Sequence, residues 1–226
     1  MNDEITLMRH KIAELGRMMF ERRLTDTAGG NISARASDKI CITPRFAGSK
    51  FRWQLRPEQV LVCDLNGNYL EGEGETSREA KVHFRLLQEF PEGNAVVHAH
   101  AQNVQVFCAA GMSIPPVAED MLKFGEIEVC QFAPAHSEDL SRFIAEKMHT
   151  RLEALKKQAA IVLAPWHGVF VLGKDIDAAY DALERVDGAA RILLMIALLP
   201  GVTDPAKLLA ERIQTLKEAA AKYGKK

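Results

Sequence analysis

Apolar residues recur along this chain with two spacings, one typical of helices and one typical of strands. Near the start, Leu7, Ile12, Leu15 and Met19 follow a helical period and predict a helix over residues 5–23. The same period predicts helices over residues 77–90, 101–110, 138–155, 176–199 and 205–223. Shorter alternating or continuous apolar runs predict strands over residues 31–35, 39–44, 59–72, 95–100, 126–133, 159–166 and 168–173.

The order of these elements predicts the class of fold. Hairpin strands come first, separated by Ser-Asp and Asn-Gly turns, and helices are interspersed with strands later. This order favours an α/β sandwich, in which helices cover a mixed, mainly antiparallel sheet, over a doubly wound or barrel arrangement. A chain of 226 residues that is 47% hydrophobic can bury one sizeable core, so we expect a single domain over residues 1–226.

Charge and cysteine usage narrow the classes of partner and the compartment. The formal net charge is -1 and no basic block precedes the C-terminal end, which argues against nucleic acid or an acidic membrane as partner. The longest apolar run, residues 192–199, is too short to span a bilayer, and the N-terminus lacks a signal core. Four widely spaced cysteines in apolar surroundings, without a C-x-x-C pair, favour a reducing cytoplasm: Cys41, Cys63, Cys108 and Cys130.

The histidines of "VVHAHAQ" are the strongest chemical signal. In a strand, His98 and His100 are two residues apart and project from the same face, close enough to share a metal ion. His167, at a Trp-His-Gly corner after an apolar strand, is a third candidate ligand. Solvated strand positions and a hairpin turn are the alternatives for these residues. The remaining histidines outside helix 77–90 are assigned no metal-binding role: His10, His136 and His149.

A carboxylate that completes the metal shell is expected at Glu79, in "GETSREAKVHF". The same residue has a structural interpretation, because Thr76 and Glu79 have the T-x-x-E spacing of a capping box at a helix start. His83 lies four residues further on the same helical face and either competes as a ligand or supports Glu79. The spacing leaves these roles open.

The stretch "TDTAGGNISAR" places two glycines and an asparagine between a helix and a strand. One interpretation is a helix C-cap and turn, because Gly and Asn tolerate positive φ. The other is a group of exposed backbone amides that holds an anion such as phosphate, since glycine lets a ligand approach the main chain. The local sequence does not decide between them.

Taken together, these motifs resemble one family. "TAGGNISAR", "ITP", "TSRE" before a helix, "AVVHAHA" and "HGVFV" occur in the order and approximate spacing of the class II aldolase/adducin family, over about residues 5–199. The resemblance implies a three-layer α/β/α sandwich and a homotetramer with active sites between subunits. It places metal ligands at His98, His100, His167 and Glu79. It also places three residues at the phosphate of a substrate: Gly30, Asn31 and Ser77.

Several positions depart from the pattern of the sugar-phosphate aldolases. Arg45 and Phe46 follow "ITP" where Thr-Gly is usual, and Arg78 follows Ser77 where a second serine is usual. Two alternatives follow for the anionic group of the substrate: it is a phosphate held by guanidinium groups, or it is a carboxylate. The fork of an arginine side chain can bind either group. The segment "IPPVAEDMLKFG" lacks the aldolase tyrosine, and its Asp120 resembles the acid/base carboxylate of the epimerase and dehydratase branches. Tyr223, in "KYG", resembles the tail tyrosine that closes the aldolase site.

The resemblance implies a metal-dependent lyase that cleaves a ketose phosphate, or a similar sugar-derived acid, by retro-aldol chemistry through an enediolate that the ion stabilises. Glu79 is the expected base, and Asp120 or Tyr223 the expected acid. Zn²⁺ is the preferred ion, with Mn²⁺, Co²⁺ or Fe²⁺ as alternatives. The alternative functions are a dehydratase, 4-epimerase or decarboxylase with the same metal site, and then a non-catalytic adducin-like assembly module.

Overall fold

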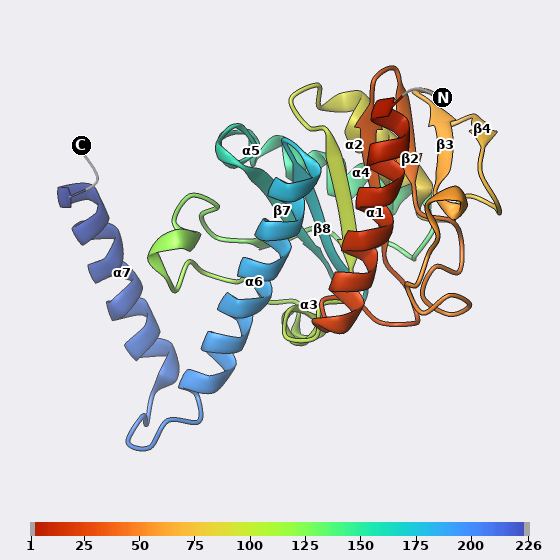
Figure 1. The fold of residues 1–226 in the computed structure, drawn as a ribbon. Coiled ribbons are helices and arrows are strands. Elements are labelled where there is room, and N and C mark those ends of the chain that lie inside the picture. Colours follow the sequence, from red (N-terminus) through yellow and green to blue (C-terminus); the bar gives the residue numbers. More distant parts are fainter. Residues whose placement is uncertain (1–2, 224–226) are drawn as a thin grey trace.

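The computed structural model describes residues 3–223, and one sheet of eight strands forms its centre (Figure 1). The strands are β1 (Asn31–Ala36), β2 (Lys39–Ile42), β3 (Leu61–Asp64), β4 (Tyr69–Glu71), β5 (Ala95–Ala99), β6 (Glu128–Val129), β7 (Ala159–Ala164) and β8 (Gly168–Gly173). Their order in the sheet is β4-β3-β2-β1-β5-β8-β7-β6. Within the described residues, β6 and β7 pair in parallel and all other neighbours are antiparallel. The expected mixed, mainly antiparallel sheet is therefore confirmed.

Helices cover both faces of the sheet. On one face lie α1 (Asp3–Glu21), α3 (Val104–Ala110) and α6 (Ile176–Ile196), and on the other lie α2 (Ala80–Glu89), α4 (Glu138–His149) and α5 (Leu152–Lys157). Alternate strand residues feed two separate cores, as the pleat requires. Val97 and Val171 pack toward α1 and α6, whereas Val96 and Phe170 pack toward α2 and α4. The three-layer α/β/α sandwich is thus confirmed.

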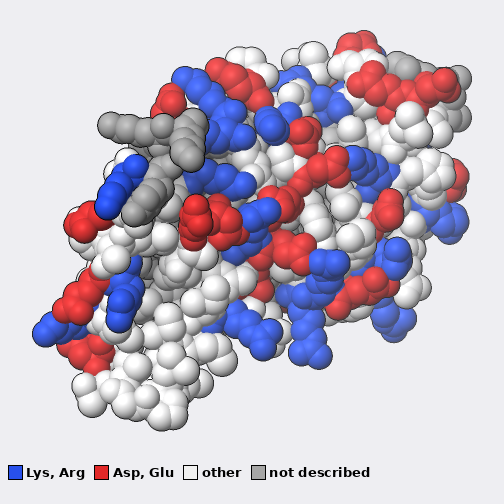
Figure 2. Space-filling view, turned by 60° about the vertical axis from the view of Figure 1, so that its left-hand side comes forward, with Lys and Arg blue, Asp and Glu red and all other residues white. Residues whose placement is uncertain are grey.

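The last helix, α7 (Pro205–Tyr223), extends away from the sandwich after a turn that follows α6 (Figure 1). Its apolar residues Leu209 and Ile213 are only half-buried. Charges of both signs are scattered over the face shown in Figure 2. The projecting end, where α6 turns into α7, is largely uncharged. None of the helices in residues 3–223 combines the length and apolarity that a membrane span needs.

Several expected elements end or begin differently, and at two of the boundaries the structure shows a local hydrogen bond. The strand expected over residues 95–100 ends at Ala99, so His100 follows it. The helix expected over residues 101–110 begins at Val104, where the Asp187 carboxylate accepts hydrogen bonds from the backbone N–H groups of residues 103 and 104 at 2.9 and 3.2 Å. The helix expected over residues 138–155 is broken near Arg151, whose guanidinium donates to the Phe124 carbonyl at 2.5 Å.

Candidate metal centre

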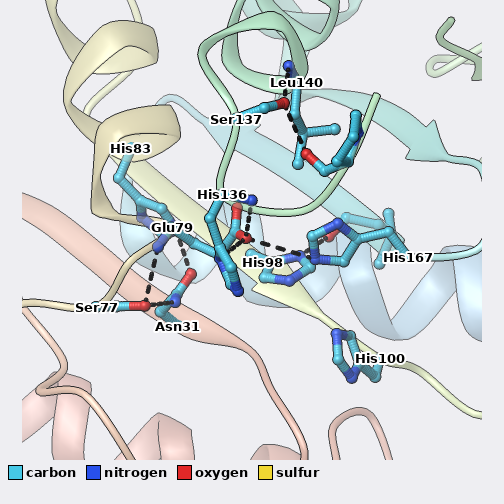
Figure 3. Close-up of polar contacts among 12 residues, drawn as sticks. Asn31, Ser77, Glu79, His83, His98, His100, His136, Ser137, Leu140 and His167 are labelled. Atoms are coloured by element: carbon cyan, nitrogen blue, oxygen red, sulfur yellow. Dashed lines mark hydrogen bonds and ion pairs between the residues drawn. The ribbon is translucent and has the colours of Figure 1, made fainter. Parts of the chain in front are cut away.

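Three imidazoles meet beside the end of β5 (Figure 3). His98 lies in β5, His100 directly after it, and His167 in the turn between β7 and β8. Their ring centroids are 5.2 Å (98–100), 4.8 Å (98–167) and 5.9 Å (100–167) apart. One nitrogen of each ring lies within 4.8 Å of the corresponding nitrogen of the others. The structure thus brings all three expected histidines together.

Hydrogen bonds fix two of these rings and leave a nitrogen of each of them unpartnered. His98 Nδ1 donates to the Val169 carbonyl at 3.1 Å, and His100 Nδ1 lies 3.2 Å from Asp26 Oδ1. The buried Nε2 atoms of both rings have no hydrogen-bond partner among the described residues. A carbonyl or carboxylate behind Nδ1 selects the tautomer whose Nε2 carries the free lone pair that a metal ion requires.

Burial keeps two of these rings, His98 and His167, neutral. It lowers the pKa of His98 well below its ordinary value, and the neighbouring His167 and His100 lower it further. Burial, followed by the influence of His100 and His136, lowers the pKa of His167 to about 4. Neutral imidazole is the form that binds a divalent cation, and these two rings have no proton to lose at neutral pH. The donor set therefore fits a divalent metal ion such as zinc.

Glu79 lies beside the three histidines but outside the set of ligand atoms within 4.8 Å. Its Oε1 is 3.9 Å from His167 Nε2, and its Oε2 is buried without a hydrogen-bond partner among the described residues. The capping-box prediction is wrong, because α2 begins at Ala80 and the Glu79 side chain makes no cap hydrogen bond. The carboxylate instead accepts a hydrogen bond from the backbone N–H of His136 at 3.0 Å.

His136 is the site residue that sequence reasoning missed. It lies in the loop before α4, and its Nδ1 is 2.5 Å from Glu79 Oε1, without the geometry of a hydrogen bond. It also lines the cavity that contains the three histidines. Its backbone has φ +67°, in the left-handed region that favours glycine. A histidine at such a backbone position has no signature in the sequence.

The first glycine of "TAGGNISAR" makes room for a histidine. A Cβ on Gly29 would lie 2.4 Å from His100 Cε1 and 2.9 Å from Nε2, which is closer than atoms can approach. Gly30 has φ +96°, and a Cβ there would lie 2.6 Å from Thr25 Oγ1. Both residues line the cavity. Gly29 is therefore needed to seat a candidate ligand, whether or not the segment also binds an anion.

Gly29→Ala is expected to weaken metal binding by about 10- to 100-fold, as other changes that misplace a ligand do. The backbone of Gly29 is outside the left-handed region, so the added methyl group acts by displacing the His100 ring. Isothermal titration with Zn²⁺ measures the effect. Gly188→Ala is the control, because a Cβ there meets nothing within 4 Å in the middle of α6. Equal zinc affinity in both variants would contradict this role of Gly29.

A buried hydrogen-bond network links β1 to the start of α2 (Figure 3). His83 Nε2 lies 2.6 Å from Asn31 Oδ1, and its Nδ1 lies 2.7 Å from Ser33 Oγ. Asn31 Nδ2 donates to Ser77 Oγ at 2.7 Å. Because Asn31 Oδ1 can only accept, His83 carries its proton on Nε2 and accepts from Ser33. Both His83 nitrogens are therefore used, so this residue supports Asn31 and Ser77 rather than binding metal.

His83 makes stability depend on pH. Complete burial lowers its pKa from 6.5 to about 3, so the unfolded chain binds a proton there at a pH where the native state does not. Its contribution to stability is present above about pH 6.5 and is lost as pH falls toward 3. We expect His83 to contribute a slope of up to about 1.4 kcal/mol per pH unit in this range. Urea unfolding at pH 7 and pH 5 measures it, and an equal loss in His83→Gln would contradict the assignment.

The histidines, Glu79 and the glycine segment share one cavity of about 450 Å³, a size that suits a small ligand. Asn31, Ser77 and Arg78 also line it. Arg78 is exposed and has no acidic partner within residues 3–223. Arg45, on the same wall, pairs with Glu75 at 3.0 Å and has a buried Nε without a hydrogen-bond partner among the described residues. The cavity thus has unsatisfied cationic donors near the imidazoles.

Of the two remaining expected catalytic residues, Asp120 does not line this cavity within one chain, and the side chain of Tyr223 is not described. Asp120 lies in a 3-10 turn (Glu119–Met121), where its carboxylate forms an ion pair with Arg185 at 2.6 Å. Tyr223 is the last residue of α7, and its side chain lies outside the described residues. Among the described side chains, the cavity of a single chain therefore contains the candidate metal-binding histidines, Glu79 and the polar wall, without Asp120.

Known proteins share this arrangement of sequence and fold. The family model "Class II Aldolase and Adducin N-terminal domain" matches residues 10–194. An L-fuculose phosphate aldolase of Methanococcus maripaludis is 30% identical over 78% of this chain and 90% of its own length. A 3-oxo-tetronate 4-phosphate decarboxylase of Haemophilus influenzae is 29% identical over 82% of this chain and 86% of its own.

A solved L-fuculose 1-phosphate aldolase has the same fold, with a TM-score of 0.74 and 24% identity over 96% of this chain and 97% of the other. The match of the family model extends from α1 into α6 and includes all three histidines and Glu79. The motifs, the three-layer fold and the sequence matches agree with one another. The chain belongs to the class II aldolase and adducin family.

Proposed function

We propose that this protein is a metal-dependent aldolase that cleaves the C3–C4 bond of a ketose phosphate. The observation that carries the proposal is the group of three imidazoles, each with an unpartnered nitrogen, next to a buried carboxylate that has one oxygen unpartnered. A module used only for assembly has no need for these unsatisfied groups in a cavity. The aldolases among the relatives act on sugar phosphates, which agrees with this choice.

In this proposal His98, His100 and His167 hold the divalent cation, for which Zn²⁺ is our first choice. When bound there, the ion supplies a Lewis acid that lowers the energy of negative charge on the substrate's carbonyl and hydroxyl oxygens. Burial holds His98 and His167 in the neutral form that this role needs. The rings of His98 and His100 are oriented by the Val169 carbonyl and the Asp26 carboxylate. Mn²⁺, Co²⁺ and Fe²⁺ suit the same donors.

Glu79 is the proposed base. Its unpartnered Oε2 takes the proton of the C4 hydroxyl, the C3–C4 bond breaks, and the electron pair of that bond passes to the ketose fragment as the aldehyde forms. A carboxylate can take this proton when one of its oxygens lies within hydrogen-bond distance of the hydroxyl. A proton then has to reach C3 of the remaining fragment. We assign that step to Asp120 or Tyr223 of a neighbouring subunit in a homotetramer, because Asp120 does not line the cavity of its own chain.

The anionic end of the substrate is assigned to the polar wall of the cavity. Asn31 and Ser77 are held together by a hydrogen bond at 2.7 Å, and Gly30 lies in the same wall. Arg78 adds a guanidinium without an acidic partner within the described part of the chain. A phosphate dianion matches these donors in charge and in number of acceptor oxygens. The four cysteines are buried and free, which suits a protein of the reducing cytoplasm.

Incubation of the zinc-loaded protein with a panel of ketose phosphates tests the reaction. Mass spectrometry is expected to show an aldehyde and dihydroxyacetone phosphate or a related fragment, with no carbon lost. If a substrate is consumed but its carbon skeleton is unchanged, the protein is not an aldolase, and the result favours an epimerase or dehydratase.

Decarboxylation is the second candidate, because a decarboxylase is among the relatives and Arg78 suits a carboxylate as well as a phosphate. The same panel is extended to 3-oxo acid phosphates to test this candidate. A decarboxylase would release carbon dioxide, so the product would have one carbon fewer than the substrate. A purified protein with no affinity for any divalent ion would favour an assembly module instead.

A further inference from the structure

Helix α3 holds the turn that carries His167 at three successive residues. The backbone N–H of Trp166 donates to the Cys108 carbonyl at 3.1 Å. The side-chain amide of Gln105 donates to the His167 carbonyl at 2.9 Å. The Cys108 thiol donates to the Gly168 carbonyl at 3.4 Å, and burial raises the pKa of this thiol to about 12, so it keeps the proton that it donates. The turn between β7 and β8 is thus bonded to one side of α3.

The imidazole of His167 is not itself held by a hydrogen bond. Its Nδ1 is buried without a hydrogen-bond partner in the described structure, and its Nε2 lies 3.9 Å from Glu79 Oε1, beyond hydrogen-bond distance (Figure 3). His98 and His100, by contrast, are each oriented through Nδ1. Apart from ring contacts with His98 and Phe170, the position of the third imidazole therefore depends on the backbone that carries it.

The backbone of this turn is strained and lies close to the other two candidate ligands. Trp166 has φ +54°, in the left-handed region that residues other than glycine avoid, and such a conformation persists only where neighbouring groups fix it. A Cβ on Gly168 would lie 3.2 Å from His98 Cε1 and 3.0 Å from His100 Cδ2. A small shift of the turn would therefore change the distances among the three imidazoles.

The helix that holds the turn is itself fixed in place. At its start, the buried Asp187 carboxylate of α6 accepts hydrogen bonds from the backbone N–H groups of residues 103 and 104. Phe107 and Cys108 are buried in the core on the same side of the sheet as α6. A side chain on a helix anchored in this way offers its donor at a defined place. Because Gln105 bonds to the carbonyl of a candidate ligand residue, its side chain helps to set the distance between the helix and that ligand.

We propose that Gln105 is a positioning residue whose amide, bonded to the carbonyl of His167, keeps that imidazole where it can share a divalent cation with the other two. This inference rests on the proposed function, in which the three histidines hold the ion. It assigns a role to a helix that carries none of the candidate ligands. Loosening of the turn should therefore weaken metal binding through His167 and not through the two rings that have their own hydrogen bonds.

Gln105→Met tests this role, because methionine has nearly the length of glutamine but no N–H donor. Gln105 is only half-buried, so the substitution should leave the fold intact. Gln88→Met is the matched control, since Gln88 Nε2 also donates to a backbone carbonyl, that of Leu65 at 2.9 Å, and neither residue lines the cavity. Each variant loses one hydrogen bond of the same kind, so both melting temperatures should fall by similar, small amounts.

Cobalt titration without substrate, followed by visible absorption spectroscopy, is the first measurement. We expect Gln105→Met to bind Co²⁺ about 10-fold more weakly than the unmodified protein, within the range typical of changes behind the ligands. Its spectrum should also be altered, because His167 is displaced. Gln88→Met should match the unmodified protein in both respects. Equal cobalt affinities and spectra in the two variants would overturn the inference.

The imidazole NMR signals of the metal-free protein are the second measurement. Gln105→Met should shift or broaden the Cε1–H signal of His167 much more than those of His98 and His100, which keep their own hydrogen bonds. Changes of equal size in all three signals would show a general loosening of the site and would also overturn the inference. Failure of the proposed function looks different. In that case the unmodified protein would bind no cobalt, or would bind it equally well after His98→Ala.

Discussion

His98→Ala is expected to abolish metal binding and activity together while the protein still folds. This ring supplies a free Nε2 from the most deeply buried of the three imidazoles and stacks on Phe170 with ring centroids 4.1 Å apart. Loss of a direct ligand should weaken binding by more than the roughly 10- to 100-fold effect of changes behind the ligands. Loss of the stacked ring should lower the free energy of unfolding by about 2 kcal/mol, because a small cavity remains.

Elemental analysis of the purified variant, together with circular dichroism, measures these effects. His10→Ala is the matched control, since that histidine is exposed on α1 and far along the chain from the site. The control should retain metal and activity. Stoichiometric zinc in folded His98→Ala would show that this residue is not a ligand.

Glu79→Gln is expected to have the opposite signature, with metal retained and turnover lost. The amide keeps the size of the side chain and still accepts a hydrogen bond from the His136 N–H, but it cannot take a proton. Loss of a general base lowers kcat by about 10²- to 10⁴-fold. Because the three imidazoles are untouched, zinc content should not change.

Steady-state kinetics on whichever ketose phosphate the panel identifies, with zinc content measured in parallel, tests this. Glu89→Gln, at the other end of α2, is the control and should behave as the unmodified protein. Undiminished turnover in Glu79→Gln would show that Glu79 is not the general base. Loss of zinc would show that Glu79 is a ligand rather than a neighbour of the ion.

The sequence predicts the parts of this site that depend on strand geometry. His98 and His100 are two residues apart at the end of an apolar run, so their convergence follows from the pleat even though His100 lies just past the strand. His167 was predictable as a residue at a strand end. The layers follow from the order of hairpins and helices, because short connections leave few alternative arrangements.

The sequence did not predict the contacts between side chains that are far apart along the chain. The spacing of Thr76 and Glu79 indicated a capping box, because that rule considers only one helix turn. The carboxylate instead meets His136, which is 57 residues away, and no local pattern records such a partner. Similarly, the role of His83 became clear only from Asn31 and Ser33 on a strand that precedes it by about fifty residues. The glycine segment indicated an anion site, while the need of the His100 ring for space at Gly29 appears only in three dimensions.

A crystal of the protein grown with Zn²⁺, with anomalous diffraction recorded at the zinc edge, tests the central claim most directly. The account predicts one strong peak per chain, at about 2.0–2.1 Å from a nitrogen of each of His98, His100 and His167. No peak between these rings, or zinc held by other residues of the chain, would contradict it.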